Sequence, residues 1–370
     1  MTFKKKLLLT AFLFFALTYG SWTAVRVWVR LRAYSKLSQI ASFRSEADKE
    51  LAADGIQVLY EANGNKIAFS NWSGIRIQLG DDYDAVPQLD IQNRFCPHEI
   101  RCVKIISGRP YGQREPQSLL KQEDFDQFSI CNDLSYLELS GMAIDSLDIS
   151  DDFPDLKELV IETSCVVGTL RLGVRSGLTK LKYYSDGGPA PVDLVDVLSH
   201  ASSLRSCDLS GQSVPKTVLT AVQRLQDLRW LTLKGSIVPA SWLSRMACRD
   251  SLEVLRIDGV DADEALCETL RSMVELRVLD INIDGLADGD FGELFNSENS
   301  IEMLILRSPL VSDDSTKQLK KNALLQLRDN KKLKVLSIPE TAIDADVLNE
   351  IRLLRPDLWI QVARVRDVEI

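Results

Sequence analysis

The sequence predicts an α/β solenoid, in which short repeats stack side by side, and three observations support this fold class. The pattern L-x-x-L-x-L recurs nine times between Leu134 and Ile343. Successive copies begin 22 to 32 residues apart. The three apolar columns of the pattern are aliphatic in every copy except at Cys207 and Tyr183. An apolar pattern that recurs at this spacing indicates that each copy is one structural unit, packed on its neighbours.

The copies have the length and the apolar pattern of leucine-rich repeats. In each copy the L-x-L pair is expected on a short strand, with both side chains pointing into the core. The residues that follow have helical spacing in most copies, as at Leu194, Val197 and Leu198. We therefore predict a right-handed horseshoe with a parallel sheet on the concave face and helices on the convex face. The copies begin at Leu134, Leu156, Leu178, Leu204, Leu228, Leu252, Leu276, Ile301 and Leu333.

The charge of the chain is unevenly distributed. The 370 residues have a net charge of −9, with 45% hydrophobic and 26% charged residues, which is ordinary for a folded protein. Residues 1–49 carry a balance of +7, whereas residues 50–370 carry −16. An acidic body repels phosphate backbones, so the composition argues against nucleic acid as a partner of the folded part.

Residues 1–32 are predicted to anchor the chain in a membrane. Lys4, Lys5 and Lys6 precede an uncharged run over residues 7–25. As a helix this run would span about 28 Å, close to the thickness of the bilayer core. A cleaved signal peptide is the alternative, although the run is long for one and Thr18 and Gly20 form a poor cleavage site. A basic tail before a first apolar segment usually stays inside, so we expect a single-pass protein with its repeats on the exported side, periplasmic or extracellular.

Two further regions precede the array. Residues 33–54 are predicted to form a juxtamembrane helix or stalk. Residues 55–130 are predicted to form a β-rich cap, with strands at residues 56–60, 66–69 and 75–79 and a tight turn at Asn63-Gly64. A degenerate repeat is expected at Ile100, Val103 and Ile105, followed by a polar loop from Arg109 to Ser129.

Residues 131–370 form the predicted repeat array. Its longest copy, from Ile301, is expected to contain an extra polar helix at about residues 315–328. A last strand over residues 355–360 is expected to close the carboxyl end, because the apolar end layer of a solenoid must otherwise face water.

The order of these segments resembles a group of membrane-anchored bacterial leucine-rich repeat proteins. The motifs that carry the likeness are DGIQVLYEANGN, IQLGDDYDAVPQLDI and, at residues 333–348, LKVLSIPETAIDADVL. The likeness covers nearly the whole chain, but the Thr of that group's repeat is present only at Thr341. The resemblance implies the fold and a membrane location, and it carries over no active site.

One column of outward-pointing strand residues is a candidate binding surface. It begins at Tyr136 and becomes apolar over five consecutive repeats, which would form a stripe roughly 20 Å long. An exposed apolar stripe rimmed by charge marks an interaction site. The alternative is structural, because Val favours strands and a terminal segment could cover the column. The five apolar residues are Trp230, Val254, Val278, Met303 and Val335, and the rim is Arg229, Arg256, Asp258, Arg277, Asp280, Asn282 and Arg307.

Catalytic, metal and cofactor sites are not predicted. The chain has only two histidines, and Cys96, His98 and Cys102 lack a fourth zinc ligand in register. A disulfide between Cys96 and Cys102 is an alternative if the domain is exported, while most of the seven cysteines fit as small buried hydrophobes. No glycine-rich phosphate loop or metalloprotease motif is present in the sequence.

The sequence thus predicts a non-enzymatic, membrane-anchored leucine-rich repeat protein that binds another protein through its concave face. A structural scaffold of the cell envelope is the first alternative. A regulatory or substrate-receptor subunit of an enzyme is the second, and no residue supports it directly.

Overall fold

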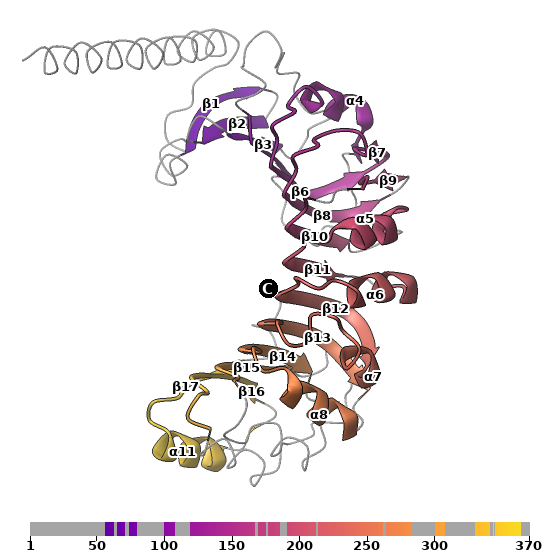
Figure 1. Ribbon diagram of the computed structural model, residues 1–370. Coiled ribbons are helices and arrows are strands. Elements are labelled where there is room, and N and C mark those ends of the chain that lie inside the picture. The colour runs from indigo at the N-terminus through magenta and orange to yellow at the C-terminus, as the bar shows by residue number, and fades with distance from the viewer. Residues whose placement is uncertain are drawn as a thin grey trace, which may run out of the picture.

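The repeats stack into an open arc with strands along its inner side and helices along its outer side (Figure 1). The structure is a computed structural model. It describes residues 56–62, 65–70, 74–79, 100–107, 119–166, 169–174, 177–185, 191–211, 214–261, 264–282, 300–307, 330–340, 343 and 345–363.

One long sheet runs through the described part of the molecule. From β4 onward its strands are parallel, and each pairs with the strand of the next repeat. The parallel sheet on the concave face is thereby confirmed. Its strands are β4 (Cys102–Ser107), β6 (Tyr136–Ile144), β8 (Glu158–Val166), β10 (Lys180–Ser185), β11 (Ser206–Ser210), β12 (Trp230–Pro239), β13 (Val254–Asp261), β14 (Val278–Asn282), β15 (Met303–Arg307), β16 (Val335–Pro339) and β17 (Trp359–Ala363).

A hairpin begins the sheet at its amino-terminal end. Strands β1 (Ile56–Ala62) and β2 (Asn65–Ser70) are antiparallel, and Ala62 pairs with Asn65 across the predicted Asn63-Gly64 turn. Strand β3 (Gly74–Leu79) pairs with β2 and, in parallel, with β4. The buried side chains of Ile75 and Ile77 extend the core into this cap. Strands therefore lie at the three predicted places, and Ile100, Val103 and Ile105 are buried.

The two inward positions of each strand form the core. Leu137 and Leu139 are completely buried, and the corresponding residues of the other repeats are nearly so. Cys207 and Tyr183, which interrupt the aliphatic columns, occupy the same buried positions. The backbone hydrogen bonds between neighbouring repeats follow the same regular pattern. For example, the N–H groups of Arg229 and Trp230 both donate to the carbonyl of Arg205, at 2.9 and 3.0 Å.

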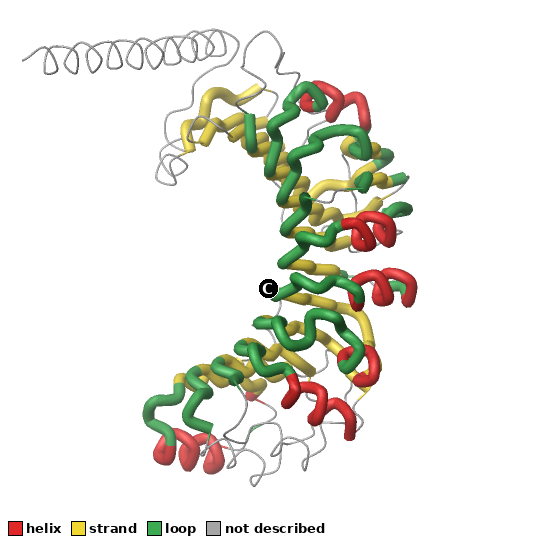
Figure 2. The backbone as a smooth tube through the Cα atoms, viewed as in Figure 1, coloured by secondary structure: helices red, strands yellow, loops and turns green. Residues whose placement is uncertain are grey.

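Helices cover much of the convex side (Figure 2). Their apolar faces pack on the core, as Val218 and Val222 of α6 do. In the first repeats two-residue strands stand in place of helices: β7 (Leu147–Asp148) pairs with β9 (Leu170–Arg171), and β5 (Leu119–Leu120) pairs with β6. The helices are α5 (Leu194–His200), α6 (Lys216–Gln223), α7 (Ala240–Leu243), α8 (Glu264–Ser272) and α11 (Ala345–Leu354).

The predicted loop from Arg109 to Ser129 is wrong from residue 119 onward. Residues 122–128 form two short helices, α4 (Gln122–Phe125) and η2 (Asp126–Phe128). These helices form because their aromatic rings pack into the core. Phe125 and Phe128 are fully buried, and Phe125 meets Phe153 edge to face with the ring centroids 5.8 Å apart.

Several predicted segments lie outside the described residues. These are the membrane anchor, the stalk and the extra helix at about residues 315–328. Within the part of the chain that the structure does describe, no helix is both long and apolar enough to cross a membrane.

Candidate functional site

An apolar stripe crosses the concave face from β12 to β17. Its six members face one another in register on adjacent strands. Adjacent strands lie about 4.8 Å apart, so the stripe is roughly 24 Å long. The two tryptophans at its ends are 41% and 62% exposed, and the four residues between them are partly exposed. From one end to the other the stripe is Trp230, Val254, Val278, Met303, Val335 and Trp359.

Trp230 is held in place although its ring faces solvent. Its indole Nε1–H donates to Thr232 Oγ1 at 3.2 Å. The guanidinium of Arg256, on the next strand, lies 5.2 Å from the centroid of the Trp230 ring. A cation over an indole face is attracted by the ring quadrupole. Trp230 and Arg256 are therefore an ordered pair at one end of the stripe.

Three cations precede strands of the stripe, and a fourth, Arg205, precedes the adjacent strand β11. We call Arg205, Arg229, Arg277 and Lys334 the basic rim, and all four are exposed. Two have carboxylate partners: Arg229 lies 2.7 Å from Glu253, and Lys334 lies 2.6 Å from Glu302.

The charge along this rim has the opposite sign to that of the body. Arg205 and Arg277 form no ion pair with the described residues. The pKa of Glu302 is held below its usual value by a hydrogen bond from Lys334 and, to a smaller extent, by the charge of Arg277. The rim from residue 205 to 334 thus has two more cations than anions, on a body of charge −16.

The column beside the stripe carries the carboxylates of Asp208 and Asp280 and the guanidinium of Arg256, and Arg307 lies in the column after it. Arg307 Nε donates to the buried carboxylate of Asp280. Asp208 accepts from Ser210 Oγ at 2.5 Å, and burial raises the pKa of Asp208 despite the nearby Lys182, Lys234 and Arg256. Arg256 Nε is buried and finds no acceptor among the described residues. A buried donor without an acceptor is unfavourable and requires an explanation.

The amino-terminal half of the concave face is polar, and its side chains form hydrogen bonds and ion pairs with one another. Glu138 accepts hydrogen bonds from Tyr136 Oη at 2.8 Å and Ser140 Oγ at 3.2 Å, and Lys104 lies 2.8 Å from it. Burial opposes ionisation of Glu138, but these donors outweigh it and lower its pKa. Further ion pairs join Lys180 to Glu158, at 3.5 Å, and Lys182 to Glu162.

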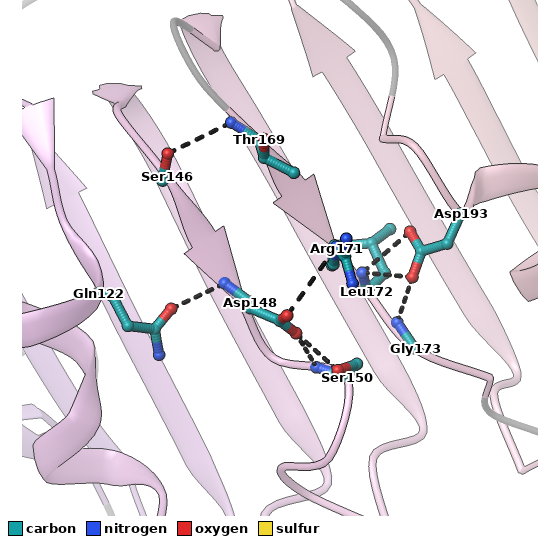
Figure 3. Close-up of polar contacts among 9 residues, drawn as sticks. All are labelled: Gln122, Ser146, Asp148, Ser150, Thr169, Arg171, Leu172, Gly173 and Asp193. Carbon is teal, nitrogen blue, oxygen red and sulfur yellow. Dashed lines mark hydrogen bonds and ion pairs between the residues drawn. The ribbon is translucent and has the colours of Figure 1, made fainter.

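A polar cluster on the convex side has a structural role (Figure 3). Asp193, which precedes α5, accepts the N–H groups of Leu172 at 2.9 Å and Gly173 at 2.6 Å. Asp148 accepts the N–H and the hydroxyl of Ser150, at 3.0 and 2.6 Å, and these bonds lower its pKa.

Gly173 is required within this cluster. Its φ is +73°, and a Cβ there would lie 2.4 Å from the carbonyl oxygen of Ser150. Donors of the protein itself occupy the carboxylates of Asp148 and Asp193, and Asp193 joins its repeat to the one before it.

The described cysteines are poor nucleophiles. Burial raises the pKa of the Cys102 thiol to about 11, that of Cys131 to about 12 and that of Cys248 to about 11. The pKa of the fully buried Cys207 is raised as well. Cys102 is a free thiol, while Cys96 lies outside the described residues. Within the described ranges, no three His, Cys, Asp or Glu side chains gather to hold a metal ion.

The structure brings together most of the residues that the sequence nominated. The five predicted stripe residues are adjacent, and Arg229, Arg256, Asp280, Arg277 and Arg307 surround them. Tyr136 lies apart, in the polar half, beside Lys104 and Glu138. The side chains of Asp258 and Asn282 are not among those that the structure describes.

One end of the stripe was not predicted from the sequence. Trp359 extends it, because Val335 pairs with Trp359. The available signal was the alternation of Trp359, Ile360 and Val362, which repeats that of Val335, Leu336 and Ile338.

The repeats, the parallel sheet and the convex helices define a leucine-rich repeat solenoid. No protein-family model matches the chain, and comparison with curated protein sequences gives no match. Among solved structures, it is similar to an internalin from Listeria monocytogenes, with 14% identity and a TM-score of 0.43, over 80% of this chain and 84% of that one.

A leucine-rich repeat protein from Leptospira interrogans is also similar, with 14% identity and a TM-score of 0.29, over 71% of this chain and 84% of that one. The repeats and the sheet of this chain are sufficient by themselves to define the leucine-rich repeat fold.

Proposed function

We propose that this protein is a non-enzymatic binding protein that holds another protein against the apolar stripe. The observation that supports this best is the register of six apolar side chains, the first and last of which are exposed tryptophans. Protein interfaces are anchored by a few aromatic and arginine side chains near their centres, and exposed apolar patches rimmed by charge are typical of them. The ordered pair of Trp230 and Arg256 offers both kinds of anchor.

Photo-crosslinking tests this proposal within one repeat. A photo-crosslinking amino acid at position 278 lies in the stripe, whereas one at position 274 replaces a valine that is 59% exposed and precedes the strand. In cells we expect a discrete protein adduct from position 278 and none from position 274. Trp230→Glu should reduce the adduct at least about tenfold, because a buried charge destroys an apolar anchor. An adduct that forms equally from both positions, or that survives Trp230→Glu, would contradict the proposal.

We further propose that residues 1–32 anchor the protein in a membrane and that the array lies on the exported side. The support is the uncharged run between basic flanks. Protease treatment of intact cells and of spheroplasts tests this. Digestion of the array once the outer barrier is opened is the expected result, and protection until the inner membrane is lysed would place the array in the cytoplasm.

A structural scaffold is the second candidate. Leu353 and Leu354 of α11 are 83% and 43% exposed at the carboxyl end of the solenoid, where they offer an apolar surface for end-on association. Self-association that Leu353→Glu abolishes, and that Trp230→Glu leaves intact, would favour the scaffold over the binding protein.

A further inference from the structure

The residues around the stripe carry an excess of positive charge, which favours a negatively charged partner. In this half of the concave face the basic rim outnumbers its carboxylate partners, Glu253 and Glu302. The rest of the protein from residue 50 onward is strongly acidic. A partner that approaches this half meets cations beside apolar side chains, which favours carboxylates at the edge of its own apolar surface.

Arg256 is the cation best placed to bind such a carboxylate. Its guanidinium is already ordered over the Trp230 ring, so little side-chain entropy remains to be lost on binding. The carboxylate of Asp280, opposite it on β14, accepts from Arg307, and that of Asp208 accepts from Ser210. Arg256 Nε is a buried donor with no acceptor among the described residues.

We propose that the stripe binds an acidic segment of a partner protein, whose apolar side chains lie along the stripe and whose carboxylates meet Arg256 and the basic rim. This inference rests on the proposed function and names the chemistry of the partner. A basic segment would face the same cations and be repelled.

A peptide-display library tests the inference with the full chain as bait. We expect the selected random peptides to combine Leu, Ile, Phe or Trp with an excess of Asp and Glu over Lys and Arg, at least about threefold above the unselected library. Their binding should weaken as salt is raised, since the rim is exposed.

Substitutions then assign the selectivity to one residue. Arg256→Gln should weaken the selected acidic peptides about tenfold or more, and Arg256→Lys should weaken them less, because it keeps the charge and loses the planar donors. Lys180→Gln, in the polar half, removes the same charge from the same face and should leave their affinity unchanged. An unchanged far-UV circular dichroism spectrum and melting temperature would show that each variant is folded.

The outcomes separate this inference from the proposed function. Peptides that Met303→Glu releases, but that show no acidic excess or ignore Arg256→Gln, overturn the inference and leave protein binding in place. A library that yields no peptide sensitive to Met303→Glu also overturns it, and the crosslinks from position 278 then decide the function. A dimer in sedimentation that Trp230→Glu dissociates would assign the stripe to a second copy of this chain and overturn the acidic partner.

Discussion

Two residues on the concave face, Asp208 and Arg256, are in environments that lower the free energy of unfolding. Asp208 is a half-buried carboxylate whose pKa is raised by burial, and Arg256 Nε is a buried donor with no acceptor among the described residues. Stable proteins avoid both features unless they serve another purpose. They lie in one column beside the stripe, on β11 and β13, the two strands that flank the strand of Trp230. Local unfavourable features of this kind concentrate at functional sites.

The raised pKa of Asp208 predicts a pH-dependent effect of Asp208→Asn. Below the unfolded pKa the wild-type carboxyl is protonated in both states, so its ionisation does not affect stability. As the pH rises towards the higher pKa of the folded state, the unfolded state loses its proton first, and the free energy of unfolding falls. Asn keeps an oxygen for Ser210 and cannot ionise.

We therefore expect Asp208→Asn to melt at a higher temperature than the wild type at pH 7, with the difference disappearing near pH 3. Thermal unfolding across this range measures it. Asp155→Asn, at an exposed position before β8, removes the same charge and is the control. A difference between Asp208→Asn and wild type that is constant with pH would show that burial of the charge is not its cause.

At the scale of elements, the sequence predicted those that repeat and failed where the chain departs from the repeat. Nine copies of one pattern located the strands, because buried residues such as Leu231 alternate with outward-facing residues in the same way in each copy. Helix α4 has only four residues, too few to display a helical period. Its formation depends on contacts distant in sequence, such as that between Phe125 and Phe153. The short pair of β7 and β9 is equally dependent on the neighbouring repeat.

The candidate site was partly predictable for the same reason. Membership of the stripe follows from register, which the repeat pattern fixes, so Trp230, Val254 and Val278 were identified correctly as neighbours. Which charges pair is set by side-chain geometry across strands. The bond between Arg307 and Asp280, and the absence of one to Arg256 Nε among the described residues, required the structure.

In the described part of the molecule, a buried arginine holds the carboxyl-terminal end of the array together. Arg355 Nη1 and Nη2 donate to the carbonyls of Asn330 and Leu333, and the guanidinium also binds Asp357 at 2.8 and 2.9 Å. Asn330 Oδ1 in turn accepts the N–H of Leu333 at 3.2 Å. This network ties the last strand, β17, to the repeat before it, as a capping unit must.

Arg355→Met should loosen this end alone. The substitution leaves buried carbonyls without donors, and we expect a local loss of about 2 kcal/mol or more. Because repeats contact only their neighbours, the loss should stay local. Hydrogen–deuterium exchange should accelerate in β16 and β17 and remain unchanged in β6 and β8. Arg352→Met, on the exposed face of α11, is the control, and equal acceleration throughout the array would contradict local capping.

The pairing of each strand with that of the next repeat has a consequence for how the chain folds. Contacts within the sheet join residues about one repeat apart in sequence, whatever the length of the array. No closure between distant ends is needed, so the entropy of forming a long loop never arises. Folding can begin at any repeat and spread outward, and the first repeats can form while later ones are still being synthesised.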